Sequence, residues 1–103
     1  MDKRKSEIIR KLKKFKKENK IQKMIFFGSR AGNNYNKYSD IDLVIVSPRF
    51  KKLKSFQRPA TVRLKWNLKY PVDMLCFTPE EFERKKTAPS IVKEALENGI
   101  EIK

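Results

Sequence analysis

Two short segments of the sequence carry side chains that together suit phosphate chemistry. Residues 28–31 read Gly-Ser-Arg-Ala, and residues 39–43, which begin ten residues after Ser29, read Ser-Asp-Ile-Asp-Leu. A Gly-Ser turn offers backbone N–H groups and a hydroxyl to a phosphate. Asp40 and Asp42 offer the carboxylate oxygens that Mg²⁺ prefers, and Mg²⁺ can neutralise a nucleotide triphosphate. The pairing of these segments predicts nucleotidyl transfer.

Both segments need neighbouring strands to hold them. The apolar run over 23–27 predicts a strand that ends at the Gly-Ser turn. The run over 40–46 predicts a second strand, and side-chain alternation places Asp40 and Asp42 on the same face of it. Gly28 lets a phosphate approach the backbone, Ser29 donates its hydroxyl and N–H, and Arg30 adds positive charge.

A third strand is predicted over 72–77, with Asp73 inside an otherwise apolar run. An unpartnered carboxylate is costly to bury, so Asp73 either meets a lysine at a sheet edge or joins Asp40 and Asp42. Three carboxylates suffice for two Mg²⁺ ions, with Mn²⁺ as an alternative metal. In that arrangement Asp73 binds the second ion and helps to remove the proton of the attacking hydroxyl.

Helices are predicted around these strands. An apolar stripe over 6–18 indicates a helix with Ser6 as its N-cap and Asn19 at its end. Thr78-Pro79-Glu80-Glu81 is typical of a capped helix start. A last helix is expected over 90–97, followed by a short strand over 100–102.

The segment between the second and third strands has two interpretations. From Val62 onward apolar and polar residues alternate, which by itself indicates a strand. A helix over 59–69 is favoured instead, because Pro59 suits a first helical turn. The segment over 50–55 is expected to be an exposed basic loop.

Composition limits the class of protein. The chain has 103 residues, which indicates one small domain over 1–103. One cysteine, Cys76, excludes an internal disulfide and is expected to be a buried thiol, and the absence of histidine argues against a zinc cluster. No signal peptide or membrane span is evident, so a soluble cytoplasmic protein is expected.

The net charge is strongly positive. Lys and Arg total 26 against 12 Asp and Glu, which gives a formal charge of +14. This charge favours an anionic ligand such as a triphosphate, RNA or an acidic protein surface. Lysine-rich surfaces also occur in proteins from hot habitats, so the charge names no single partner.

At this point the sequence resembles a known family, the minimal nucleotidyltransferases of the DNA polymerase β superfamily. The resemblance rests on the motif over 28–31, the motif over 39–43 and the later strand with Asp73, and it extends over nearly the whole chain. It implies an α/β (α+β) fold of the polymerase β nucleotidyltransferase type. In that fold a small mixed sheet carries helices mainly on one face and the metal site on the other.

The resemblance also implies roles for individual residues. Asp40, Asp42 and Asp73 are the expected catalytic and metal-binding carboxylates, and the expected nucleotide-binding residues are Gly28, Ser29 and Arg30. One departure concerns the glycine that the family usually has shortly after the turn. This chain has Gly32-Asn33 there, and Asn33 tolerates the left-handed conformation that glycine would supply.

Members of this family look like ATP users, and many pair with a HEPN-type toxin. The resemblance therefore implies Mg²⁺-dependent transfer of a nucleoside monophosphate, AMP from ATP, to a hydroxyl, as in a protein adenylyltransferase that serves as an antitoxin. Two other function classes stay open. One is a catalytically idle antitoxin that binds its toxin, and the other is a basic RNA-binding module, which the sequence disfavours because the interleaved aromatics of common RNA modules are missing.

The chain is too short to enclose an acceptor substrate, so the acceptor is expected to be held by a partner chain, by a second copy of this chain or in a shallow groove. Phe50, Leu53, Phe56 and Trp66 lie among lysines near the expected rim of the site and are candidates for docking that partner. For Trp66 and Phe56 alone, an ordinary place in the core is the favoured interpretation.

Overall fold

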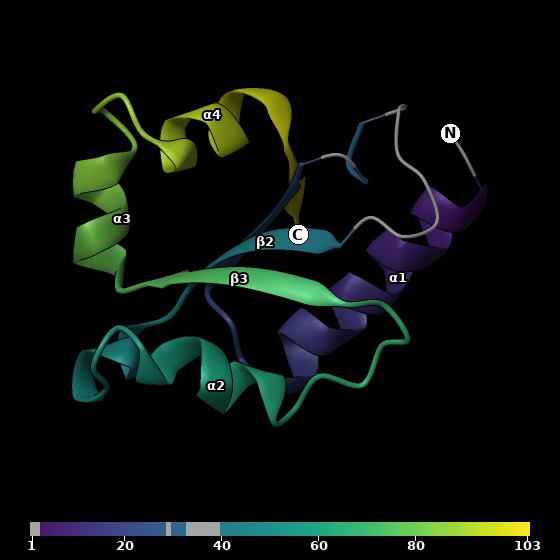
Figure 1. The fold of residues 1–103 in the computed structure, drawn as a ribbon, viewed down its shortest axis with the longest axis horizontal. Helices are drawn as coiled ribbons and strands as arrows, with labels where there is room; N and C mark the ends of the chain where they lie inside the picture. The colour runs from purple at the N-terminus through teal and green to yellow at the C-terminus, as the bar shows by residue number, and fades with distance from the viewer. Residues whose placement is uncertain (1–2, 29, 33–39) are drawn as a thin grey trace.

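One four-stranded mixed sheet organises the protein in a computed structural model, which describes residues 3–28, 30–32 and 40–103 (Figure 1). The strands are β1 (Lys23–Phe27), β2 (Ile41–Val46), β3 (Val72–Phe77) and β4 (Ile100–Ile102). Their order across the sheet is β3-β2-β1-β4, with β2 and β3 parallel and the other pairs antiparallel. The predicted strands are all present, and β2 starts one residue later than expected.

Helices connect and cover the strands. They are α1 (Lys3–Glu18), α2 (Gln57–Arg63), α3 (Pro79–Lys85) and α4 (Ile91–Asn98), with a 3₁₀ helix η1 (Pro48–Lys52) between β2 and α2. Figure 1 shows α2 on one side of β3 and the pair α3 and α4 on the other. Within the described part of the chain, no helix is both long enough and apolar enough to cross a membrane.

Each face of the sheet has its own core, because strand side chains alternate between faces. The first face packs against α1 and α2 through the larger cluster, which includes Ile8, Leu12, Phe15, Met24, Phe26, Leu43, Ile45 and Met74. The second face packs against α3 and α4 through a smaller cluster of Ile25, Val44, Val46, Phe82, Val92 and Ala95.

The α/β fold class with a small mixed sheet is confirmed, but the distribution of helices differs from the expectation. Helices were expected mainly on one face, whereas α3 and α4 cover the second face at the end of β2 that holds Val44 and Val46. The physical reason is that β2 is apolar on both faces after Asp42, as strands in parallel pairs often are. The other end of the second face carries Asp42, which is half-buried, and Asp73, which is exposed.

The helix boundaries correct two further expectations. Helix α1 begins at Lys3, so Ser6 lies inside the helix and is not its N-cap, because lysine and arginine extend the helix beyond its apolar stripe. Asn19 does close this helix, since its side chain donates to the Phe15 carbonyl at 3.0 Å. Helix α2 is confirmed as a helix over the strand alternative, but it spans Gln57–Arg63 and not 59–69.

The third helix begins as expected. Thr78 accepts a hydrogen bond from the Glu81 N–H, and the Glu81 side chain accepts one from the Thr78 N–H at 2.8 Å. This reciprocal capping box satisfies two backbone donors that a helix start leaves open. The cap also fixes the direction in which the chain leaves β3.

The apolar residues proposed for partner docking are mostly structural. Phe50 is buried in η1, so the segment over 50–55 is not simply an exposed loop. Trp66 packs edge-on against Phe15 with ring centroids 5.2 Å apart. Phe56 is 75 % exposed, so its expected place in the core is wrong, and it stays available for docking. Leu53 is half-buried against the first core. Cys76 is half-buried, and burial raises its pKa to about 12.

Candidate active site

The Gly-Ser turn is built against a carboxylate of the next strand. Gly28 follows β1 with φ of +82°, a left-handed conformation that favours glycine. The Ala31 N–H donates to the Gly28 carbonyl at 3.2 Å and closes the turn. A Cβ added at Gly28 would lie 2.0 Å from Asp42 Oδ2. Position 28 therefore requires glycine for two reasons: its backbone is left-handed, and Asp42 occupies the space that a side chain would need.

Two of the three expected carboxylates lie side by side. Asp42 in β2 and Asp73 in β3 are register partners across the parallel pair, so both point to the second face. Asp40 precedes β2 and is exposed. Burial raises the pKa of Asp42 above its usual value, and the carboxylates of Asp73 and Asp40 raise it further. The arrangement is therefore strained by like charge, and a bound cation would relieve it.

The three carboxylates do not form a finished metal centre. In the described residues, no three His, Cys, Asp or Glu side chains gather closely enough to hold an ion together. The expected convergence of Asp40, Asp42 and Asp73 on one point is therefore not seen in the described residues. The donor set still fits Mg²⁺, since Asp42 and Asp73 are adjacent carboxylates on one face and Asp40 acts on Asp42 electrostatically.

Of the expected nucleotide-binding residues, the structure describes Gly28 and Arg30. Gly28 lies at the site, while Ser29 and Asn33 fall outside the described residues. Arg30 is only 3 % exposed, and its guanidinium lies over the Tyr70 ring, 4.8 Å from the centroid. This contact anchors the turn to the segment before β3. The expected contact of Arg30 with phosphate stays a prediction, and the burial favours a positioning role.

A cleft of about 450 Å³ lies beside the turn, between β1 and α4. Gly28 and Gly32 line it from the turn, and Ile91, Glu94 and Asn98 line it from α4. These three α4 residues were not predicted as part of the site. Their spacing of three and four residues places them on one helical face, which was the available signal. Tyr70 was also missed, and no local pattern marks it.

Comparisons with known proteins point to one family. A family model described as "Nucleotidyltransferase domain" matches residues 7–102. A Methanocaldococcus jannaschii protein named "Putative protein adenylyltransferase" is 29 % identical over 102 residues, covering 93 % of this chain and 99 % of the relative. The crystal structure of a "putative nucleotidyltransferase" from Sulfolobus solfataricus superposes with a TM-score of 0.60 at 25 % identity. That match covers 78 % of this chain and 75 % of the other.

Proposed function

Because the chain belongs to the nucleotidyltransferase domain family, we propose that it transfers AMP from ATP to a hydroxyl group of a protein, with Mg²⁺ at Asp42, Asp73 and Asp40. The observation that carries the proposal is the contact between the Gly28 turn and Asp42, with Asp73 in register beside it. The turn that we propose for phosphate binding therefore lies beside paired carboxylates. The choice of AMP rests on the name of the M. jannaschii relative.

The residues of the chain divide the work. Asp42 lies between Gly28 and Asp73, so we assign it the central position of the cation site. One or two Mg²⁺ ions bound there would neutralise triphosphate charge and lower the pKa of an acceptor hydroxyl. Asp73 is exposed, so it can accept the proton of an incoming hydroxyl. Ser29 and the turn N–H groups donate to the terminal phosphates.

The remainder of the nucleotide fits the cleft beside the turn. Ile91 is half exposed and offers an apolar surface to a base or ribose, and Asn98 offers an amide for hydrogen bonding. Glu94 accepts hydrogen bonds from ribose hydroxyls or a base amine. These contacts give the nucleotide a binding energy that is separate from its phosphates.

A partner protein completes the site in this proposal, because Asp40 and Asp73 are exposed and can be reached by an acceptor. The family resemblance makes a HEPN-type toxin the leading partner, with this chain as its antitoxin. In the test, the protein, ATP and Mg²⁺ are incubated with the product of the neighbouring gene, and the intact mass of both chains is measured. A gain of one or more AMP units on the partner supports the proposal.

Variants separate the proposal from its alternatives. Asp73→Asn should abolish the gain of AMP, and Glu97→Gln, which removes the same charge from an exposed position on α4, should leave it intact. Co-elution of the two proteins without any AMP transfer would instead favour an idle binding antitoxin. Transfer that persists in Asp73→Asn would contradict the assigned site.

A further inference from the structure

The outer edge of β3 has no strand beside it in the described part of the chain. The Ile41 N–H donates to the Pro71 carbonyl at 2.9 Å, and the Ser47 N–H donates to the Phe77 carbonyl at 3.1 Å. Odd-numbered residues of this segment therefore turn their backbone groups towards β2. Val72, Met74 and Cys76 turn theirs outward, to the open edge.

Among the described residues, two arginine side chains donate hydrogen bonds to this edge, one near each end. Arg63 Nη2 donates to the Val72 carbonyl at 3.0 Å, and Arg58 Nη1 donates to the Cys76 carbonyl at 3.4 Å. Between them, the outward N–H and C=O of Met74 have no hydrogen-bond partner among the described residues. Such a pair is a template for another strand, because strand addition satisfies both groups at once.

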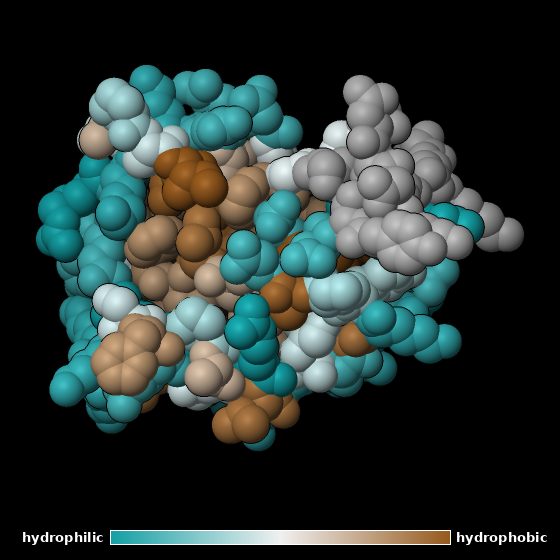
Figure 2. Space-filling model, viewed as in Figure 1, coloured by the Kyte–Doolittle hydropathy of each residue, from teal (hydrophilic) through white to brown (hydrophobic). Residues whose placement is uncertain are grey.

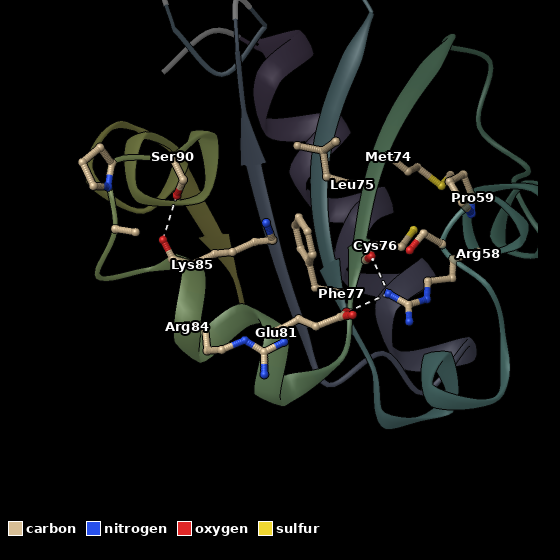
Figure 3. A pocket seen from close by; sticks show the side chains of 13 residues that line it. Arg58, Pro59, Met74, Leu75, Cys76, Phe77, Glu81, Arg84, Lys85 and Ser90 are labelled. Carbon is tan, nitrogen blue, oxygen red and sulfur yellow. Dashed lines mark hydrogen bonds and ion pairs between the residues drawn. The ribbon is translucent and has the colours of Figure 1, made fainter.

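A groove of about 730 Å³ follows the same edge. Its walls are Arg58 and Pro59 of α2 on one side and Arg84 and Lys85 of α3 on the other, with Met74 to Phe77 as its floor (Figure 3). Figure 2 shows apolar atoms gathered between the positions that α4 and β3 have in Figure 1, with hydrophilic atoms around them. The groove is therefore an open strand edge between two helices, with polar walls and an apolar floor.

The charge of the groove favours an acidic occupant. Glu81 is neutralised by Arg58 at 2.7 Å, so Arg84 and Lys85 leave the lining with a net positive charge. A second copy of this chain would bring another such lining and a formal charge of +14 against the first. Like-charge repulsion opposes that pairing, whereas an acidic segment of another protein is attracted.

The register connects the groove to the candidate active site. Asp42 and Asp73 are opposite each other on the second face, and a strand added outside β3 would continue that row. Its residue opposite Asp73 would point to the same face, with Cβ atoms about 4.5–5.5 Å apart. Residues two and four positions further along would lie beside Leu75 and Phe77, which are half-buried apolar side chains on that face.

We propose that the open edge of β3 binds an extended acidic segment of the partner protein as a fifth strand and places a hydroxyl residue of that segment opposite Asp73. The inference rests on the proposed function, which it deepens by naming the form of the acceptor. The hydroxyl oxygen forms a bond to the α-phosphorus of ATP, the bond from that phosphorus to the bridging oxygen breaks, and pyrophosphate leaves. The hydroxyl proton passes to the Asp73 carboxylate.

The test uses a short peptide whose pattern follows from the groove. It has tyrosine first, valine at the third place and glutamate elsewhere, so the fifth residue carries a charge opposite Phe77, on the face where α3 brings Arg84 and Lys85. The reversed sequence is tested as well because either strand direction keeps the facing rule. A version with lysine in place of glutamate is the charge control. Amide hydrogen exchange at Met74 and Cys76, measured by NMR without nucleotide, should slow about tenfold with the acidic peptide.

Matched variants locate the binding. Cys76→Pro removes an outward N–H, as an edge position of a strand permits, and should abolish binding, while Cys76→Ala keeps that N–H and should bind. Arg84→Glu should weaken binding about fivefold, whereas Lys13→Glu, an equal charge change on exposed α1 surface, should not. The Arg84→Glu comparison remains decisive if Cys76→Pro fails to fold.

Each result has a defined meaning. Slowed exchange at β3 together with AMP transfer to the peptide tyrosine supports the inference. Protection of β3 in the absence of peptide, with a dimer on size-exclusion chromatography, would overturn it in favour of self-association. Equal binding of the lysine peptide, or unchanged exchange at Met74 and Cys76, would also overturn it. ATP binding with Mg²⁺ is measured separately by calorimetry, and its failure would instead count against the proposed function.

Discussion

Replacing Gly28 by alanine should destabilise the fold and disable the candidate site through one contact. The added Cβ would lie 2.0 Å from Asp42 Oδ2 and 2.9 Å from Asp42 Cγ, so the Asp42 side chain must rotate away. The left-handed backbone at φ +82° costs a non-glycine residue about 1–2 kcal/mol. Displacing a packed side chain costs about 1–3 kcal/mol more. The total of roughly 2–5 kcal/mol corresponds to a loss of roughly 10–20 °C in Tm.

A double-mutant cycle separates the two contributions. Asp42→Ala removes Oδ2 and Cγ of the side chain and leaves its Cβ. That Cβ would lie 3.2 Å from the Cβ added at position 28, which is tight but tolerable. Gly28→Ala should then cost only the backbone contribution. We therefore expect a coupling free energy of about 1–3 kcal/mol between the two substitutions, equal to the side-chain contribution.

Urea denaturation of the four proteins measures this coupling directly. Equal m-values across the set are the control, because they show that the unfolded state is unchanged. If the changes in the free energy of unfolding caused by the two single substitutions add up to that of the double variant within about 0.5 kcal/mol, the close approach of Gly28 to Asp42 is refuted.

Three further predictions concern other ionisable groups. Asp42→Asn should stabilise the protein at neutral pH in EDTA, because the raised pKa of Asp42 means that its charged form destabilises the fold. In urea titrations, the gain in the free energy of unfolding should disappear as the pH falls below 3.8, the ordinary pKa of an aspartate. Glu81→Gln should destabilise the protein by about 1–3 kcal/mol at neutral pH, since the Thr78 N–H and then Arg58 lower the pKa of Glu81. The difference in the free energy of unfolding from wild type should shrink as the pH falls below 4.5, and a difference that stays constant would contradict this prediction. Burial raises the pKa of Cys76 to about 12, so labelling by a thiol reagent at pH 8 should be far slower than in urea-unfolded protein, and equal rates would contradict the burial.

The strands were the most predictable part of the fold. Alternation and apolar runs gave β1, β3 and β4 with the boundaries seen in the structure. Each pattern is local, and apolar residues dominate it. Alternation does not tell which strands pair with each other. The adjacency of Asp42 and Asp73 was therefore expected from the family resemblance, and the parallel register of β2 and β3 shows it.

Burial within charged segments was the least predictable part. Phe50 stands among lysines yet is buried, because η1 turns it onto the first core. Arg30 is buried beneath the turn because an aromatic ring, Tyr70, lies under it from a distant part of the chain. Such contacts depend on tertiary packing between distant segments, which no spacing within a single segment reveals.

Calorimetry of ATP binding tests the central claim most directly. The protein is titrated with ATP in the presence of Mg²⁺ and again in EDTA, for the wild type and for Asp73→Asn. If the adjacent carboxylates hold the cation that carries the triphosphate, wild-type affinity should fall at least about tenfold in EDTA, and Asp73→Asn should show a much smaller dependence on the metal. Equal wild-type affinity with Mg²⁺ and with EDTA would contradict the assignment of this site.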